Sequence, residues 1–558
     1  MVSNNQLFHL FLFLCFFQIT CLHAQLCTQE QTSALLQFKQ QFSFNNDADY
    51  GYCDSVGILS YPKMESWKEG SDCCSWDGVE CDNKTSQVIG LDLSCSWLNG
   101  TIHPNSTIFH YFPHLQSLNL AFNYFGMSPI SSEFSRFTRL THLNLSGFSF
   151  SGKVPIEVSF LSKLVSLDLS NNYDLRLEEP GFELLVQNLT KVRELNLCSV
   201  NISSVVSNSL LNLTSLTHLD LSSCGLLGKF PDEILHLPHL NKLIIWDNLA
   251  LTGYFPEFIN SSSPLQYLDL SVTNFSGELP DSIGNLKSLK MLDASYCKFY
   301  GSIPTSLGNL TEMTDLDIGY NNFTGMLPSS LSNLGNLVLL RVDSNSFSGP
   351  FPSLGANLTK LVELDLSNNQ LRGPLPSQII GLPNLTWLSL GDNLINGTIP
   401  SWVFSLPALD YFNLSNNKLT GHVKEFKSTH LTVVDLSNNN LHGRFPSSTF
   451  KLVNLSSLLL SSNNFNGELD MLCHAISLQI LVLSSNSFNG SIPQCLGNFS
   501  IYLSVLDLQK NNFSDIIPDT FVKENSFETI NLDSNGFEGA NTKIFRELQN
   551  ATSARPWT

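Results

Sequence analysis

The chain has 558 residues and a mass of 62.0 kDa, roughly the length of three or four ordinary domains. It is 42% hydrophobic but only 14% charged, and its formal net charge at pH 7 is −19. Because an acidic protein repels phosphate backbones and anionic lipids, this composition argues against nucleic acid and anionic membrane surfaces as partners.

Residues 1–24 carry no Asp, Glu, Lys or Arg. The apolar run from Leu7 to Phe17 is too short to span a bilayer well. It is followed by Leu22-His23-Ala24, a small residue at the point where a signal peptidase would cut. We therefore predict a signal peptide over 1–24 and a secreted chain, with an uncleaved anchor as the alternative. No later stretch reaches about 18 consecutive apolar residues, so no transmembrane helix is expected in this chain.

Residues 25–86 combine a helical pattern with a cysteine cluster. Thr28 and Gln31 form a plausible capping box, and Leu35, Phe38 and Phe42 follow at helical spacing. The cluster reads Asp72-Cys73-Cys74-Ser75-Trp76-Asp77-Gly78-Val79-Glu80-Cys81. Secretion favours disulfides here. A zinc site is the rival interpretation, although no Cys-x-x-Cys or histidine partner accompanies the cluster.

Residues 87–540 repeat with a step of about 24 residues. The segment Leu364 to Pro376, LDLSNNQLRGPLP, is followed one step later by Leu388 to Pro400, LSLGDNLINGTIP. We count nineteen such units, which open at 91, 118, 143, 167, 195, 219, 243, 268, 292, 316, 340, 364, 388, 412, 434, 458, 481, 506 and 530. One unit cannot bury its leucines alone, so the pattern predicts a stacked solenoid rather than several globular domains.

Each Leu-x-Leu is predicted to be a short strand that turns both leucines inward and the middle residue outward. Three positions later an Asn can satisfy buried backbone groups at the turn. Thirteen of the nineteen units have Asn there, without a break from Asn321 onward. The other units have Ser96, Phe148, Val200, Cys224, Thr273 and Cys297.

The tail after each strand reads Leu-x-Gly-x-Ile-Pro, as at Gly301 to Pro304 and Gly490 to Pro493. In this tail the sequence resembles the plant-type leucine-rich repeat. The resemblance implies an α/β repeat fold, a right-handed solenoid with a second short sheet. The cysteine cluster is similar to the N-terminal cap of plant receptor-type repeat proteins, which implies the pairs Cys27–Cys73 and Cys74–Cys81.

The remaining cysteines are assigned from their places in the repeat. Cys473 and Cys495 lie about one repeat apart, away from the strands, and are predicted to form a disulfide. Cys224 and Cys297 are expected to be buried at ladder positions, and Cys198 is the candidate free thiol. The pairing of Cys53 and Cys95 stays open, and a bond between the two is one possibility.

Twenty Asn-x-Ser/Thr sequons lie between Asn83 and Asn550, and we expect only a fraction to carry glycans. The candidates are Asn83, Asn105, Asn188, Asn212, Asn309, Asn357, Asn384, Asn454 and Asn498.

Large aromatic side chains on the concave strand face would depart from the small polar residues usual there and often anchor interfaces. Such residues, with charged neighbours, define a candidate binding patch on units seven to fourteen. Its members are Trp246, Tyr267, Tyr296, Tyr320, Arg341, Asp343, Trp387, Asp392 and Tyr411. Incidental packing of aromatic side chains along the strands is the equally weighted alternative.

No constellation of catalytic residues emerges, and no cofactor or metal is expected. Gly147-x-x-x-x-Gly152-Lys153 resembles a phosphate-binding loop, but Val154 replaces the metal-coordinating Ser or Thr. Asp269, Asp293 and Asp317 recur at the middle strand position and could hold a cation or a basic ligand. The favoured interpretation is that Leu-Asp-Leu-Ser is simply the usual sequence of the repeat.

The resemblance is to the ectodomain of a plant leucine-rich-repeat receptor-like protein. It implies recognition of an extracellular protein or peptide on the concave face, in defence or development, and signalling through a co-receptor kinase or adaptor. The alternative is a secreted inhibitor of a wall-degrading glycosidase, similar to polygalacturonase-inhibiting proteins. Residues 541–558 lack the closing cap and membrane helix usual in the family, so we expect an irregular tail and a truncated chain.

Overall fold

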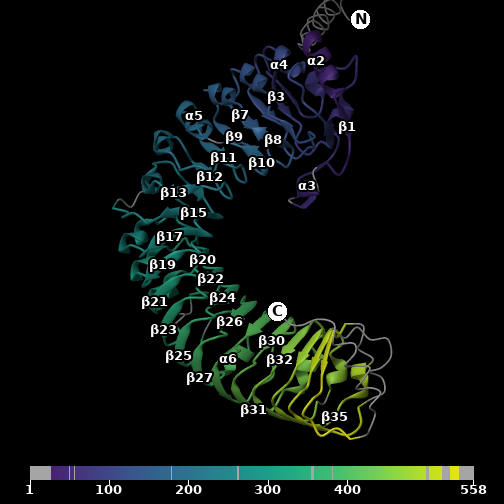
Figure 1. Cartoon of the computed structure of the whole chain (residues 1–558), viewed down its shortest axis with the longest axis vertical. Coiled ribbons are helices and arrows are strands. Elements are labelled where there is room, and N and C mark those ends of the chain that lie inside the picture. Colours follow the sequence, from purple (N-terminus) through teal and green to yellow (C-terminus); the bar gives the residue numbers. More distant parts are fainter. Residues whose placement is uncertain are drawn as a thin grey trace, which may run out of the picture. The chain divides into compact units, whose positions relative to one another are not determined.

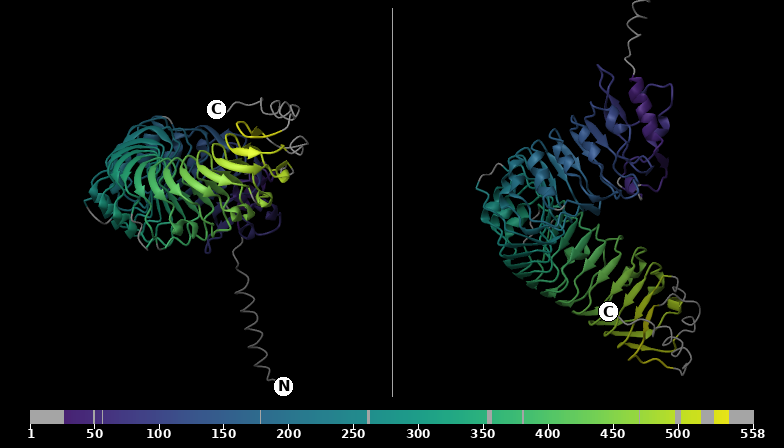
Figure 2. Two further views of the ribbon diagram at one scale, coloured as in Figure 1. Left: turned by 90° about the horizontal axis from the view of Figure 1, so that it is seen from below. Right: turned by 45° about the horizontal axis from the view of Figure 1, so that its top comes forward.

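The computed structural model describes residues 27–48, 51–55, 57–177, 179–259, 263–352, 357–379, 381–469, 471–497, 502–517 and 528–538. The predicted signal peptide and the tail 541–558 lie outside these residues. The chain divides into two compact units, Met1–Thr252 and Gly253–Thr558. Within each unit, coils of similar length stack so that their strands run side by side (Figures 1 and 2).

One short strand from each repeat enters a parallel sheet, and the register is one repeat per strand. Leu195 lies opposite Leu167 and Leu219, and Leu364 lies opposite Leu340 and Leu388. The strands of the first unit are β3 (Val88–Asp92), β5 (Ser117–Asn119), β7 (His142–Asn144), β9 (Ser166–Asp168), β11 (Glu194–Asn196), β12 (His218–Asp220) and β14 (Lys242–Ile244). Those of the second are β16 (Tyr267–Asp269), β18 (Met291–Asp293), β20 (Asp315–Asp317), β22 (Leu339–Arg341), β24 (Glu363–Asp365), β26 (Trp387–Ser389), β28 (Tyr411–Asn413), β30 (Val433–Asp435), β32 (Ser457–Leu459), β34 (Ile480–Val482), β36 (Val505–Asp507) and β38 (Thr529–Asn531). These are the nineteen predicted repeats, and the predicted fold is confirmed.

The repeat tails form a second set of strands. Their bounds in the first unit are β6 (Ser128–Pro129), β8 (Phe150–Lys153), β10 (Asp174–Arg176), β13 (Leu227–Lys229) and β15 (Asn248–Gly253). In the second unit they are β17 (Thr273–Gly277), β19 (Lys298–Gly301), β21 (Asn322–Met326), β23 (Ser346–Gly349), β25 (Gln370–Pro374), β27 (Leu394–Thr398), β29 (Lys418–Gly421), β31 (Asn440–Arg444), β33 (Asn464–Gly467), β35 (Ser487–Ser491) and β37 (Asn512–Ser514). Neighbouring members pair in parallel, as the resemblance implies.

Short helices complete most coils. The proline that ends the tail often stands directly before them, because its fixed φ suits a helix start, as at Pro304 before Thr305–Asn309. The α-helices are α2 (Gln29–Lys39), α3 (Tyr52–Ser55), α4 (Ile108–Tyr111), α5 (Gly181–Asn188) and α6 (Ser401–Phe404). The 3-10 helices are Lys63–Ser66, Cys73–Ser75, Ser132–Arg136, Ile156–Phe160, Asn208–Asn212, Asp232–His236, Asp281–Asn285, Thr305–Asn309, Ser329–Asn333, Ser447–Lys451, Leu472–His474 and Gln494–Gly497.

The ladder asparagines join each coil to the one before it. Nδ2 of Asn393 donates to the carbonyls of Leu390 and Gly391 in its own coil and to that of Leu366 in the preceding coil, at 3.0–3.2 Å. Its Oδ1 accepts the backbone N–H of Leu371 at 3.0 Å. One buried amide therefore satisfies four backbone groups that water cannot reach.

The ladder tolerates substitution where another donor takes over. The thiol of Cys297 donates to Leu270 and Ser295, the carbonyls an Asn would reach, and Cys224 does the same in its coil. Both are buried, as predicted. The break at Phe148 is a shift by one residue, because the hydroxyl of Ser149 donates to the carbonyls of Gly147 and Asn123.

The N-terminal segment departs from the expected capping box. Thr28 Oγ1 accepts the backbone N–H of Gln31 at 3.3 Å, as a helix N-cap should. The Gln31 side chain does not complete the box; its Nε2 donates to the Tyr111 carbonyl and its Oε1 accepts from the Val88 N–H. Gln31 thus fixes α2 to the first coils. Phe42 lies not in the helix but in β1 (Phe42–Phe44), antiparallel to β4 (Leu98–Gly100).

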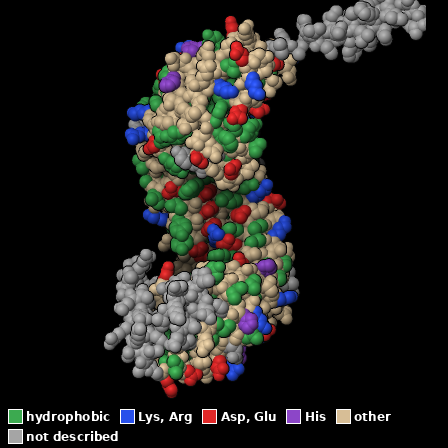
Figure 3. All heavy atoms as spheres, turned by 90° about the vertical axis from the view of Figure 1, so that its right-hand side faces the viewer, with side chains coloured by type: hydrophobic (Ala, Val, Ile, Leu, Met, Phe, Trp, Pro, Cys, Tyr) green, Lys and Arg blue, Asp and Glu red, His purple; other side chains and the backbone are tan. Residues whose placement is uncertain are grey.

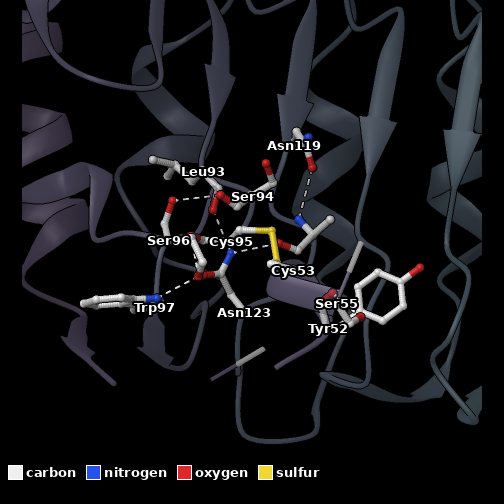
Figure 4. The surroundings of a disulfide bond; sticks show 12 residues. Tyr52, Cys53, Ser55, Leu93, Ser94, Cys95, Ser96, Trp97, Asn119 and Asn123 are labelled. Atoms are coloured by element: carbon white, nitrogen blue, oxygen red, sulfur yellow. Dashed lines mark hydrogen bonds between the residues drawn. A yellow bond between two sulfur atoms is a disulfide. The ribbon is translucent and has the colours of Figure 1, made fainter. Parts of the chain in front are cut away.

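Four disulfides bond eight of the eleven described cysteines. Cys27–Cys73, Cys74–Cys81 and Cys473–Cys495 are the expected pairs, each with Cα atoms 5.6 Å apart. The pairing left open is resolved, because Cys53 of α3 bonds to Cys95 of the first coil (Figure 4). Cys27, Cys73 and Cys74 bring their sulfurs within 4.8 Å of one another, but all three are in disulfides and are not thiolate ligands for zinc. Cys198 is free and partly exposed.

The described helices are all too short or too polar to cross a membrane.

Candidate ligand-binding site

The strand face of the second unit contains a hollow of about 360 Å³, here called the strand-face hollow. On the face that carries the strands, acidic side chains gather with a basic one among them and hydrophobic ones beside them (Figure 3). The lining residues come from β20, β22, β24 and β26 and from the turns that follow the strands. They are Ser295, Tyr296, Asp317, Tyr320, Arg341, Asp343, Glu363, Asp365 and Trp387.

Arg341 lies in the centre of a row of charges that the register creates. In the register of the sheet, Arg341 lies opposite Asp317 of β20 on one side and Asp365 of β24 on the other. Its guanidinium holds Glu363 through two bonds, Nε to Oε1 at 2.6 Å and Nη2 to Oε2 at 3.0 Å, and Nη1 reaches Asp317 Oδ2 at 3.5 Å. The hydrogen bonds that Arg341 donates to Glu363 raise the pKa of Arg341. A bidentate pair of this kind fixes the orientation of the side chain.

The recurring Asp of the strands has a structural task. Oδ1 of Asp365 accepts the backbone N–H of Ser367 at 2.9 Å, and Asp317 accepts that of Gly319 at 3.0 Å. Asp269 and Asp293 make the same turn bond. The repeat itself therefore gives each of these carboxylates a structural role at the turn.

Electrostatics single out two carboxyl groups in the hollow. Burial raises the pKa of Asp317 to about 6, against the lowering effect of its bond to Gly319 and of Arg341. Burial also raises the pKa of Asp343. Both directions reflect the cost of holding a carboxylate charge partly away from water.

Tyr296 and Tyr320 occupy a backbone position that bulky residues avoid. Each has φ near +51°, in the left-handed region, and the next coils place Ser344 and Asn368 at the same position. The two rings stack with centroids 4.0 Å apart and stay 53% and 47% exposed. A hydrogen bond with Tyr320, together with burial, raises the pKa of Tyr296 to about 12.

The structure brings together only part of the predicted patch. Tyr296, Tyr320, Arg341, Asp343 and Trp387 line the hollow. The ring of Tyr411 stacks on that of Trp387 with centroids 3.6 Å apart. Tyr267 and Asp392 are exposed and lie outside the lining of the hollow. Trp246 is 40% exposed and belongs to the first unit.

Sequence reasoning missed Ser295, Glu363 and Asp365 and treated Asp317 only as part of the stripe. The signal for these residues was available in the repeat step. Counting 24 residues in both directions from Arg341 gives Asp317 and Asp365, and Glu363 lies two residues earlier on the same strand and face.

Eight of the nine candidate glycosylation asparagines are exposed, and Asn498 lies outside the described residues. The exposed ones are Asn83, Asn105, Asn188, Asn212, Asn309, Asn357, Asn384 and Asn454. None of these eight lines the hollow.

Known proteins resemble this chain in sequence and in fold. The leucine rich repeat model matches 238–299, 340–395 and 359–419, and the leucine rich repeat N-terminal domain matches 28–82. Receptor-like protein 6 of Arabidopsis thaliana is 45% identical over 262 residues, 45% of this chain and 26% of that protein. Receptor-like protein Cf-9 of Solanum pimpinellifolium is 43% identical over 272 residues, 48% of this chain and 31% of that protein. The Arabidopsis receptor kinase HAESA, solved with the peptide hormone IDA and the co-receptor SERK1, aligns over 91% of this chain and 86% of its own with 30% identity and a TM-score of 0.77.

The chain belongs to the plant leucine-rich-repeat receptor-like proteins. The matched segments span about a quarter to a third of the length of these two curated receptor-like proteins. The likeness therefore concerns the repeat-bearing portion of a receptor-like protein.

Proposed function

We propose that the chain is the recognition portion of an extracellular plant receptor-like protein, that it binds a peptide or protein on the strand face of the second unit, and that it acts through a partner kinase. The observation that carries this proposal is the strand-face hollow. A rigid sheet presents exposed stacked aromatic rings beside a fixed charge cluster, and interfaces are commonly anchored by such groups.

Likeness to HAESA supports the kinase part of the proposal. HAESA was solved with a peptide hormone and a co-receptor, and its repeat array covers nearly the whole of this chain. The extracellular location is supported by four disulfides, which persist in oxidising compartments, and by exposed sequons.

Hydrogen exchange on the secreted, glycosylated chain tests where recognition takes place. The chain is exposed to a random peptide library, and a selected peptide is added at saturation. We expect slower exchange at β20, β22, β24 and β26, whose residues line the hollow. No selected peptide, or protection confined to the short helices, would contradict the proposal. Inhibition of a polygalacturonase by the chain would favour the inhibitor alternative instead.

The kinase step is tested separately. The co-receptor ectodomain should associate with the chain only when the selected peptide is present, and a peptide-independent or absent association would contradict that step.

A further inference from the structure

We propose that the strand-face hollow takes the cationic side chain, an arginine guanidinium or a lysine ammonium, of a peptide ligand, with Tyr296 and Tyr320 as its aromatic wall and Asp343 and Asp365 as its counter-charges. This inference rests on the proposed function and names the chemistry that its site selects.

The arginine in the hollow is engaged by the protein's own carboxylates. Three of the five N–H donors of the Arg341 guanidinium are used, because its Nε and Nη2 atoms donate to Glu363 and its Nη1 atom donates to Asp317. A ligand carboxylate that took the Nε and Nη2 donors would displace Glu363 and leave that charge unpaired. Arg341 is therefore a positioning residue that orients the carboxylates of Glu363 and Asp317.

Negative charge remains after this pairing. The hollow is lined by four carboxyl side chains and one guanidinium, and Glu363 and Asp317 are the ones that pair with it. Within the described part of the chain, Asp365 accepts from the backbone N–H and hydroxyl of Ser367, and Asp343 accepts from the Ser344 hydroxyl at 3.1 Å. Neither has a cationic partner among these contacts, so a cation in the hollow would neutralise charge that the fold leaves uncompensated.

The aromatic wall fits the same kind of ligand group. Tyr rings attract cations over their faces, and a guanidinium can also stack on them. The Tyr296–Tyr320 pair is about half exposed despite its stacking, and the next coil supplies Ser344 instead of a third ring. Trp387 adds an indole Nε1–H that is buried without an acceptor in the described structure.

The size of the hollow favours an organic cation over a metal ion. Among the described residues, no three carboxylates bring their oxygens within 4.8 Å of one another, as a shared metal would require. The hollow of about 360 Å³ instead has room for a side chain.

Gly319 helps to create this room. Other coils have Ser at that position, such as Ser295 and Ser367, and a Cβ at Gly319 would lie 2.6 Å from Asp343 Oδ1. No left-handed φ demands glycine here, so its small size is the feature that matters.

The test uses the full secreted chain and a random peptide library with acetylated N-termini and amidated C-termini, screened beside the same library with free C-termini. We expect selected peptides to be enriched in Arg or Lys. Replacing that residue by norleucine, Asp343→Asn and Gly319→Ser should each weaken binding about tenfold or more, which corresponds to about 1.4 kcal/mol. The matched variants Asp392→Asn and Gly391→Ser, outside the hollow, should bind as the parent does.

A paired substitution tests whether Arg341 positions its neighbours or binds a ligand anion directly. Arg341→Gln combined with Glu363→Gln keeps the net charge, and cationic peptides should still bind within about threefold, less than 1 kcal/mol. Selection of peptides that need a free carboxylate, with binding abolished by the paired variant, would overturn the inference. Peptides that protect the hollow but contain no essential cation would also overturn it while leaving the proposed function intact. Peptides that bind elsewhere, or no peptide at all, would instead contradict the proposed function.

Discussion

Tyr296 and Tyr320 stack in neighbouring coils with ring planes 10° apart, and both have the left-handed backbone that every coil adopts at this turn. A bulky residue held there costs about 1–3 kcal/mol, while an aromatic stack returns about 0.5–1.5 kcal/mol. The two tyrosines therefore do not maximise the stability of the fold. Residues that bind a ligand are commonly of this kind.

Replacing either tyrosine by asparagine should separate stability from binding. Asn tolerates the left-handed region, so Tyr296→Asn or Tyr320→Asn should lower the free energy of unfolding by no more than about 1 kcal/mol. Binding of a selected peptide should fall about tenfold or more. Chemical denaturation and a binding titration measure the two effects, and Asn368→Ser at the same position of a later coil is the control. A large loss of stability with unchanged binding would show that the stack is structural.

Removing Arg341 alone should harm the fold more than removing its pair. Arg341→Met leaves Asp317 and Glu363 side by side without their counter-charge. Since the Arg341 side chain is 41% exposed, we expect a cost of only about 1 kcal/mol. The Arg341→Gln, Glu363→Gln variant should lose less. Equal losses in a denaturation series would mean that the bidentate pair contributes nothing.

Asp317 should make stability depend on pH. The pKa of Asp317 is raised to about 6 in the folded state from an ordinary 3.8. Between these values the folded state binds more protons than the unfolded state, so stability falls as pH rises through this window. The loss reaches at most about 3 kcal/mol. Asp317→Asn keeps the turn acceptor and should flatten the difference in denaturation midpoint between pH 4 and pH 7.

The control for this pH experiment is Asp281→Asn, which changes an exposed carboxylate of the same unit. It should leave the slope of stability against pH as in the parent chain. Identical slopes for the parent chain and Asp317→Asn would mean that burial does not destabilise the charged form.

The asparagine ladder should be the most sensitive polar feature of the core. Asn369→Ala leaves the carbonyls of Val342, Leu366 and Ser367 and the N–H of Phe347 without their partner. Each buried unsatisfied group costs about 1–3 kcal/mol. We expect faster hydrogen exchange in β22 and β24 and a lower melting temperature. Asn464→Ala, at an exposed position of β33, should change neither; similar effects of both variants would refute a special role for the ladder.

Sequence periodicity predicted most of the fold because the physical constraint is local and repeated. The inward leucines and the Asn three residues later find their contacts in their own coil and its neighbour. One regular repeat therefore predicts the structure of the next. The departures arose where a side chain had a choice of partners. Gln31 bonds to Tyr111 and Val88, far along the chain, rather than to its own helix end. Ser149 replaces the ladder Asn only after a one-residue shift.

The repeat also makes part of the candidate site visible in the sequence, namely the residues that depart from the usual repeat sequence. Aromatic residues at outward positions stood out against the usual Ser and Asn, whereas Asp365 has the same Leu-Asp-Leu-Ser sequence as many other coils. Its place in the hollow follows from the sheet register, which sets Asp365 beside Arg341, and a residue-by-residue comparison does not reveal that relationship.

A glycan placed inside the hollow gives the most direct test of the central claim, that ligands bind there. Asp365→Asn and Asp435→Asn each create the sequon Asn-Leu-Ser at the last residue of a strand, one within the hollow and one outside it. We expect the glycosylated Asp365→Asn chain to lose binding of selected peptides and the glycosylated Asp435→Asn chain to keep it. A peptide-N-glycosidase leaves aspartate when it removes the glycan, so treatment should restore binding to the first variant. Undiminished peptide binding by the glycosylated Asp365→Asn chain would contradict the account.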